Sequence, residues 1–155
     1  MKNFWLIKFA PFRYSWEDCL KYGKFEMYSV RNHQARNHLR EMKKGDYVLF
    51  YHSQQGNCIL GRMKVIQEAH QDPTTSDPQW VSVTFEPVET FSHPVHLSEI
   101  KADQSLSGIG LIRQPRLAVV KYNTPQNSDH WLSLLNCLTL SVDYESKKKK
   151  IYSSF

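Results

Sequence analysis

The first part of the chain alternates short apolar runs with segments that begin at a helix-capping residue. Residues 3–9 (NFWLIKF) form an apolar run of strong β-formers and predict a strand. Ser15 predicts the N-cap of a helix over residues 16–22, which Gly23 ends. Residues 25–30 are predicted to be extended or loop.

A second helix is predicted from residue 33 to about 43, with Asn32 as its N-cap. Ala35, Leu39 and Met42 fall at i, i+4 and i+7, which places them on one buried stripe. The rest of the helix surface is polar and carries two arginines. The pattern therefore predicts an amphipathic helix packed on a core.

Further strands are predicted where apolar runs lie between turn residues. A hairpin loop at 54–57 and a polar loop at 70–79 separate some of these runs. The predicted strands cover residues 46–53, 58 to about 68, 80–85 with a resumption after Pro87, and 117–122. Strands without regular βαβ alternation favour an α+β fold with a curled, mostly antiparallel sheet.

Shorter elements complete the predicted domain. Residues 98–101 are expected to be a short helix, and residues 105–116 to be irregular. Ser128 predicts the cap of a final helix, and residues 143–155 predict a basic C-terminal tail. We therefore expect one domain over residues 1–142 followed by the tail. The apolar stripe of the final helix comprises Trp131, Leu134, Leu135 and Leu138.

Composition fits a folded domain. The chain has 155 residues, of which 13% are aromatic, and disordered chains lack aromatic residues. No apolar run is long enough to span a membrane, and the N-terminus lacks the pattern of a signal peptide. Three widely spaced cysteines predict neither a disulfide framework nor a metal site, so we expect a reducing, cytoplasmic location and no membrane partner.

Positive charge is concentrated in the first half of the chain. Residues 1–71 hold 12 Lys and Arg against 6 Asp and Glu, whereas the whole chain has a net charge of +5. A basic half indicates a polyanionic partner such as nucleic acid. The alternative is a domain with a slightly basic surface and no such partner.

Sequence motifs for catalysis are largely missing. The chain has no phosphate-binding GxxxxGK[ST] or GxGxxG motif and no GxSxG motif. His93 and His96 flank Pro94 and have no third ligand nearby, so we expect a surface loop and not a zinc site. Cys58 and His52 could form a thiol–base pair, but a buried strand cysteine is the commoner arrangement. We therefore predict no metal, no cofactor and no enzymatic activity.

A cluster of basic and amide side chains surrounds the start of the second predicted helix. Arginines at a helix N-terminus attract phosphate, and Asn and Gln amides can bind the edge of a base. Trp5, Tyr51 and Trp80 could stack on a base, although core packing explains a tryptophan such as Trp5 equally well. The cluster at the helix start comprises Arg31, Asn32, Gln34, Arg36 and Asn37.

Several segments, in order along the chain, resemble the EVE domain family, a branch of the PUA-like superfamily. The VRNHQARN and FYHS blocks together are the most specific of them. The similarity runs from residue 3 to about 138. The matching segments are residues 5–8 (WLIK), 30–40 (VRNHQARNHLR), 44–46 (KGD), 49–53 (LFYHS), Gly61, 72–74 (DPT) and 111–117 (LIRQPRL).

The resemblance implies a PUA-like pseudobarrel of mainly antiparallel strands with peripheral helices. It also implies a non-catalytic module that binds a modified or flipped nucleobase, notably modified cytosine in DNA, in an aromatic and polar pocket. It adds Lys8, Ser53, Arg113 and Arg116 to the expected binding residues. Alternatives are an RNA-binding PUA-like module, a nucleic-acid-modifying enzyme, and a protein-interaction module that uses the lysine-rich tail.

The chain departs from the family pattern at two places. The usual KSEP reads KFAP at residues 8–11, and the usual WDG before VRN reads MYS at residues 27–29. These changes remove a hydroxyl, a carboxylate and an indole, and we expect both to touch the pocket. Tyr51 and His52 are expected to mark the pocket wall, with one side chain on each face of their strand. The alternative is that Tyr51 is packed and His52 only closes the hairpin.

Overall fold

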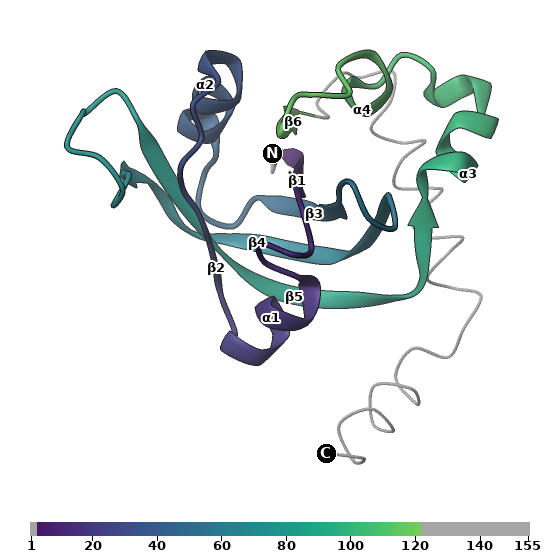
Figure 1. Cartoon of the computed structure of the whole chain (residues 1–155), viewed down its shortest axis with the longest axis horizontal. Coiled ribbons are helices and arrows are strands. Elements are labelled where there is room, and N and C mark those ends of the chain that lie inside the picture. The colour runs from purple at the N-terminus through teal and green to yellow at the C-terminus, as the bar shows by residue number, and fades with distance from the viewer. Residues whose placement is uncertain (1–2, 122–155) are drawn as a thin grey trace.

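A computed structural model describes residues 3–121 of the chain. The described residues form a six-stranded mixed sheet in the order β2-β5-β4-β3-β1-β6, curled into a half-barrel with peripheral helices (Figure 1). The expected α+β, PUA-like pseudobarrel is therefore confirmed. The strands are β1 (Phe4–Phe9), β2 (Phe25–Met27), β3 (Tyr47–His52), β4 (Cys58–Gln71), β5 (Val81–His96) and β6 (Val119–Lys121).

The helices lie around the sheet and not between its strands (Figure 1). A 3-10 helix at Gln104–Leu106 lies between α3 and α4 in the chain. No helix within residues 3–121 is long and apolar enough to cross a membrane. The predicted final helix, its apolar stripe and the basic tail lie outside the described residues. The helices are α1 (Trp16–Tyr22), α2 (His33–Glu41), α3 (Leu97–Ala102) and α4 (Gly110–Arg113).

Local capping signals place α1 and α2 where the sequence predicts them. The Ser15 side chain accepts a hydrogen bond from the Asp18 N–H, and the Asp18 carboxylate accepts one from the Ser15 N–H. Gly23 ends α1 in the left-handed region, with φ of 72°. The Asn32 side chain caps α2 by accepting a hydrogen bond from the Ala35 N–H at 2.9 Å.

Helix α2 ends earlier than expected, at Glu41 and not at residue 43. Met42 is already extended, with φ of −64° and ψ of 135°. The Lys43 N–H donates to the Asp46 carboxylate at 2.9 Å, and Gly45 turns the chain with φ of 93°. The Lys43 N–H therefore bonds to the buried Asp46 carboxylate instead of to a carbonyl of a further helical turn.

Strands β1 and β3 pair in parallel, which makes the sheet mixed, and the other four strand pairs are antiparallel, in agreement with the expected mostly antiparallel sheet. The register runs from Phe4 opposite Tyr47 to Phe9 opposite His52. A parallel pair needs a crossover, and α1, β2 and α2 supply it here. The C-terminal ends of β1 and β3 therefore meet at one edge of the half-barrel.

The hairpin of β4 and β5 is longer than expected. β4 runs to Gln71, and β5 continues through Pro87 to His96 as one strand. A register shift between Arg62 and Met63 lies at Pro87, and bulges are where strands tolerate proline. The expected surface loop at residues 93–96 is wrong, because His96 pairs with Cys58 in the ladder.

The core fills the inside of the curled sheet and the undersides of α1 and α2. Trp16 of α1 lies against Gly61 of β4, where a Cβ would overlap the indole ring and the Glu89 carbonyl. Residues 105–116, expected to be irregular, contain α4 and the end of the 3-10 helix. Their buried residues Leu106, Ile109 and Leu111 belong to the same core.

Candidate functional site

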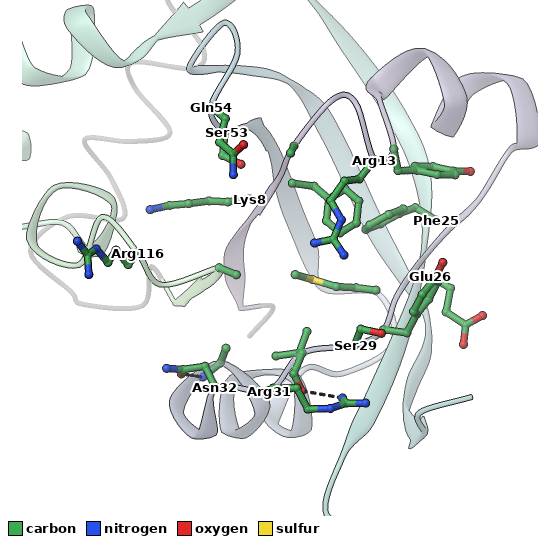
Figure 2. A pocket seen from close by; sticks show the side chains of 18 of the residues that line it. Lys8, Arg13, Phe25, Glu26, Ser29, Arg31, Asn32, Ser53, Gln54 and Arg116 are labelled. Carbon is green, nitrogen blue, oxygen red and sulfur yellow. Dashed lines mark hydrogen bonds between the residues drawn. The ribbon is translucent and has the colours of Figure 1, made fainter. Parts of the chain in front are cut away.

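A cavity of about 670 Å³ opens between the end of β1, the segment from Tyr22 to Asn32, and the loops that carry Gln54 and Arg116 (Figure 2). Five predicted site residues line it: Lys8, Arg31, Asn32, Ser53 and Arg116. The remaining lining residues are Phe9, Ala10, Arg13, Tyr14, Tyr22, Lys24, Phe25, Glu26, Met27, Tyr28, Ser29, Val30, Ala35, Gln54 and Ala118.

Lys8 brings a positive charge to the inner wall of the cavity. Its Nζ donates to the Pro115 carbonyl at 2.9 Å and the Gln114 carbonyl at 3.5 Å. Burial lowers the pKa of this amine to about 8, so it is mostly protonated at neutral pH. Figure 2 shows its side chain reaching toward the loop of Arg116, where it can donate to an acceptor on a ligand.

The opposite wall, residues 27–32, is held from behind by Asp72. The fully buried Asp72 carboxylate accepts hydrogen bonds from the Ser29 N–H at 2.8 Å and from Arg31 at 3.0 Å. Its other oxygen accepts from the N–H and hydroxyl of Thr74. Burial alone would raise the pKa of Asp72, but the bonds from Thr74, Arg31 and Ser29 outweigh it and hold the pKa at about 2. Asp72 therefore positions the wall as a carboxylate at neutral pH.

The cavity has an aromatic interior and a basic rim. The Phe25 ring lies 5.1 Å from the Phe9 ring and 5.0 Å from the Tyr14 ring, between ring centroids. Tyr22 and Tyr28 are exposed at the edge. Among the lining residues, Glu26 is the single carboxylate against five cations. Such a site favours a flat, uncharged ring inside and an anion at the entrance. The five cations are Lys8, Arg13, Lys24, Arg31 and Arg116.

Trp5 does not line the cavity, so its predicted stacking on a base is wrong for this structure. The residue is fully buried, and its indole N–H donates to the Asp46 carboxylate at 3.1 Å. This bond satisfies the one polar group of a core tryptophan. The structure therefore shows Trp5 packed in the core, the alternative to base stacking that the sequence explained equally well.

The polar residues beyond the start of α2 form a separate surface, which we call the α2 face. Arg36 lies over the Trp80 ring at 5.5 Å from its centroid and donates to Asn37 and Gln79. Arg31 lies near the same ring at 5.3 Å. None of Arg36, Asn37 or Trp80 lines the cavity.

Two further predicted residues lie near the α4–β6 loop. Gln34 exchanges amide hydrogen bonds with Gln114 at 3.1 and 3.2 Å, which ties α2 to this loop. Arg113 is exposed at the end of α4 and does not line the cavity. Both residues remain near the site without facing into it.

Tyr51 and His52 point to different surroundings, as alternation along a strand predicts. Tyr51 is buried and lines a second cavity next to the first. The His52 Nε2 accepts a hydrogen bond from the Trp16 N–H at 3.0 Å, so this ring fixes the start of α1 and is absent from both cavity linings. Burial lowers the pKa of His52, and Glu17 partly opposes this shift. Of the two residues expected to mark the pocket wall, Tyr51 thus lines the second cavity and His52 lines neither.

Cys58 lies opposite His52 in the β3–β4 ladder, but the pair lacks the properties of a nucleophile and base. Burial raises the pKa of the Cys58 thiol, whereas a reactive cysteine needs a lowered pKa. Within residues 3–121, no three His, Cys, Asp or Glu side chains gather where they could hold a metal ion.

Sequence reasoning missed most of the segment from Tyr22 to Tyr28 as part of the cavity. Its signal was present in the two departures from the family pattern, since Phe9, Ala10, Met27, Tyr28 and Ser29 all line the cavity. Both departures from the family pattern therefore lie at this cavity. The segment had no charge cluster or motif of its own, and only pairing of β2 with β5 brings it to the site.

Comparison with known proteins agrees with this fold. The sequence model of the EVE domain family matches residues 3–131 of the chain. The chain belongs to the EVE domain family. Mouse thymocyte nuclear protein 1 is 34% identical over 130 residues, which cover 65% of this chain and 56% of the mouse protein. This EVE domain thus spans about half the length of that relative.

Solved structures match over nearly the whole chain. The Rpa0253 protein of Rhodopseudomonas palustris is 29% identical, with a TM-score of 0.81 over 92% of this chain and 97% of that one. Human THYN1, in a crystal structure with DNA that contains 5-methylcytosine, is 28% identical. Its TM-score is 0.78 over 86% of this chain and 98% of that chain.

Proposed function

We propose that this EVE domain binds DNA and holds one modified cytosine, flipped out of the duplex, in the cavity beside Lys8. The main observation in support is the cavity itself, which combines an aromatic interior, a buried amine and a basic rim. Its volume of about 670 Å³ lies within the range of small-molecule sites. The similarity to human THYN1, which was crystallised with 5-methylcytosine DNA, supports the same ligand class.

The charge distribution supports a nucleic acid over a free anionic metabolite. Arg13, Lys24 and Arg116 are exposed at the rim, where flanking phosphates of a strand would pass. The interior offers Phe9 and Phe25 for contact with a ring. Extruding a base costs a few kcal/mol, and stacking and phosphate contacts offset this cost.

The lining supports a small apolar substituent on the base. Phe9, Ala10 and Met27 occupy the positions where the family pattern has a hydroxyl, a carboxylate and an indole. Apolar side chains contact a methyl group favourably and leave a polar substituent without a partner. We therefore expect 5-methylcytosine to bind more tightly than derivatives with a charged group at the same carbon.

The proposal describes a binding module and not an enzyme. Within residues 3–121, the site has a single lining carboxylate, Glu26, and the nearby Cys58 thiol has a raised pKa. Incubation with a modified oligonucleotide should therefore leave its mass unchanged. A product of altered mass would favour the enzyme alternative.

A direct test measures binding of the full chain to matched oligonucleotides by fluorescence anisotropy. The duplexes carry cytosine or 5-methylcytosine at one position, each in DNA and in RNA. We expect the methylated DNA to bind at least fivefold more tightly, with affinity falling steeply as salt rises. Equal affinity for both cytosines, or a preference for the RNA duplex, would overturn the proposal.

A pair of exposed aromatic residues supplies a matched control for the pocket. Tyr28→Ala removes a ring that lines the cavity, whereas Phe12→Ala removes a more exposed ring outside it. We expect only Tyr28→Ala to reduce the preference for 5-methylcytosine. Equal loss of preference in both variants would place the base elsewhere.

A further inference from the structure

A second cavity of about 470 Å³ adjoins the first. Five residues belong to both linings, so the two cavities meet along a common boundary rather than opening on different faces. Lys8 spans this boundary, between Gln54 and the loop of Arg116 (Figure 2). The shared residues are Lys8, Ser53, Gln54, Arg116 and Ala118.

The part of the second cavity beyond the boundary is neutral. Its own lining residues are Tyr51, Asn57, Leu97, Leu111 and Pro115, none of which carries a charge at neutral pH. Tyr51 and Leu111 are buried and form its floor, whereas Asn57 and Pro115 are exposed at its mouth. Burial also raises the pKa of Tyr51, which keeps its hydroxyl protonated.

In the second cavity, the lining cations lie only at the boundary. Lys8 and Arg116 are the two cations in the described lining of the second cavity, and both also line the first. The arrangement is thus a neutral compartment on one side, two cations between, and on the other the aromatic compartment, which also carries Arg13, Lys24 and Arg31. A phosphodiester that joins two nucleosides would place its negative charge at the two boundary cations and one neutral nucleoside in the neutral compartment.

We propose that the second cavity receives the nucleotide adjacent to the flipped base in the same strand, with Lys8 and Arg116 holding the phosphate that joins the two. This inference rests on the proposed function, since it needs a base in the first cavity. Strand continuity then places a nucleotide on each side of that base, and the shared boundary gives one of them access to the second cavity. The Tyr51 side chain and the polar Asn57 side chain line the compartment that would accept its base.

Occupation of the second cavity makes DNA binding sensitive to the nucleotide beside the modified base. An abasic tetrahydrofuran neighbour removes that base and keeps its phosphate, so the salt-dependent attraction is unchanged. We expect one of two such DNA ligands, abasic on the 5′ or the 3′ side of 5-methylcytosine, to bind roughly tenfold more weakly. Equal binding of the intact DNA and both abasic DNAs would overturn the proposal.

A cavity-filling variant tests the location. Leu97→Trp adds bulk to the second cavity alone, and Val88→Trp places the same side chain on β5 outside both cavities. We expect Leu97→Trp to weaken binding of the intact DNA about tenfold. The abasic DNA that binds the unmodified protein more weakly should bind the variant with the same affinity as it binds the unmodified protein. Val88→Trp should bind all ligands normally. The affinity for the intact DNA is divided by the affinity for the abasic DNA within each variant, so a partly unfolded preparation does not alter this ratio.

The outcomes separate this inference from the proposed function. If Leu97→Trp weakens all three ligands by the same factor, the second cavity does not hold the neighbour and the inference fails. If the unmodified protein has no preference for 5-methylcytosine over cytosine, the proposed function itself fails. A preference for 5-methylcytosine without sensitivity to either neighbour leaves the proposed function intact and removes the second subsite.

Discussion

Two buried aspartates hold this domain together, and they act on different regions. Asp46 accepts hydrogen bonds from the indole of Trp5 and the N–H of Lys43, which fixes β1 to the turn before β3. Asp72 accepts bonds from the N–H of Ser29 and the guanidinium of Arg31, which fixes the cavity wall. One carboxylate therefore organises the sheet, and the other organises the site.

The surroundings of the two carboxylates differ as well. Asp46 lies in the core beside a fully buried tryptophan, and its side-chain bonds come from neutral N–H donors. Asp72 is also buried, but Arg31, its cationic partner, is 42% exposed and lies at the cavity. Loss of Asp46 should therefore affect the whole fold, whereas loss of Asp72 should loosen mainly the wall that a ligand contacts.

The largest expected effect is on the sheet. Asp46→Ala leaves the buried Trp5 indole N–H and the part-buried Lys43 N–H without their acceptor. We expect the free energy of unfolding to fall by about 3 kcal/mol, measured by urea denaturation. The preference for 5-methylcytosine, measured on the folded fraction, should stay the same. A lost preference in folded protein would mean that this carboxylate also shapes the site.

Removing the Asp72 carboxylate should affect DNA binding more, and stability less, than removing the Asp46 carboxylate. Asp72→Ala frees Ser29 and Arg31, and we expect roughly 2 kcal/mol of lost stability together with at least tenfold weaker DNA binding. Anisotropy titrations and denaturation on the same preparation measure both quantities. Unchanged binding would show that the wall keeps its shape without Asp72.

The pH dependence of stability isolates the same carboxylate. The pKa of Asp72 is about 2 in the folded protein, below its usual value of 3.8. Its contribution is therefore complete above pH 4 and is lost as pH falls from about 4 toward 2. Asp72→Asn should remove this part of the acid transition, measured by denaturation across the pH range. An acid transition identical to that of the unmodified protein would contradict the assignment.

Titration of Lys8 should give a smaller effect, a loss of DNA affinity as pH rises, whereas the effect of Asp72 appears as pH falls. With a pKa of about 8, its amine loses the proton and its charge as pH rises from 7 to 9. DNA affinity should fall by roughly a factor of ten over this range and stay nearly constant in Lys8→Arg. The stability of the free protein should instead rise between pH 8 and 10.5, because the unfolded chain binds the proton more tightly there. A similar decline in affinity for Lys8→Arg would assign the titration to another group.

The smallest expected effect concerns the backbone of the wall. Ser29 has φ of 61°, a conformation that glycine adopts without steric cost. Ser29→Gly keeps the N–H that Asp72 accepts, so we expect a gain in stability of up to about 1 kcal/mol and binding within twofold of normal. Thermal denaturation measures the first quantity. A clear loss of stability would show that the Ser29 side chain, which donates to Thr74, matters more than backbone strain.

Local elements could be predicted because their signals lie within a few residues. The Ser15 capping box, the left-handed Gly23 and the Asn32 cap each involve neighbours at most four residues apart. The apolar run of β1 and the hairpin of β3 and β4 are equally local. The family resemblance then supplied the pseudobarrel, and the chain's membership of the EVE family bears it out.

The site was less predictable because its partners are far apart in sequence. Asp72 lies 41 residues from Arg31 and 43 from Ser29, and only the long β4–β5 hairpin brings it behind the wall. The aromatic residues gave a second ambiguity. Trp5 and Tyr51 have equal potential to stack on a base, yet one is satisfied by Asp46 and the other lines a cavity.

The sequence by itself determined where most helices and strands begin, which half of the chain is basic, and which family the chain resembles. Tertiary structure decided the parallel pairing of β1 with β3, the continuation of β5 through Pro87, and the division of the candidate residues between core, α2 face and cavities. The physical reason is the range of the interactions. Capping and periodicity act between near neighbours, whereas burial, carboxylate bridges and cavity walls depend on residues that only the folded chain brings together.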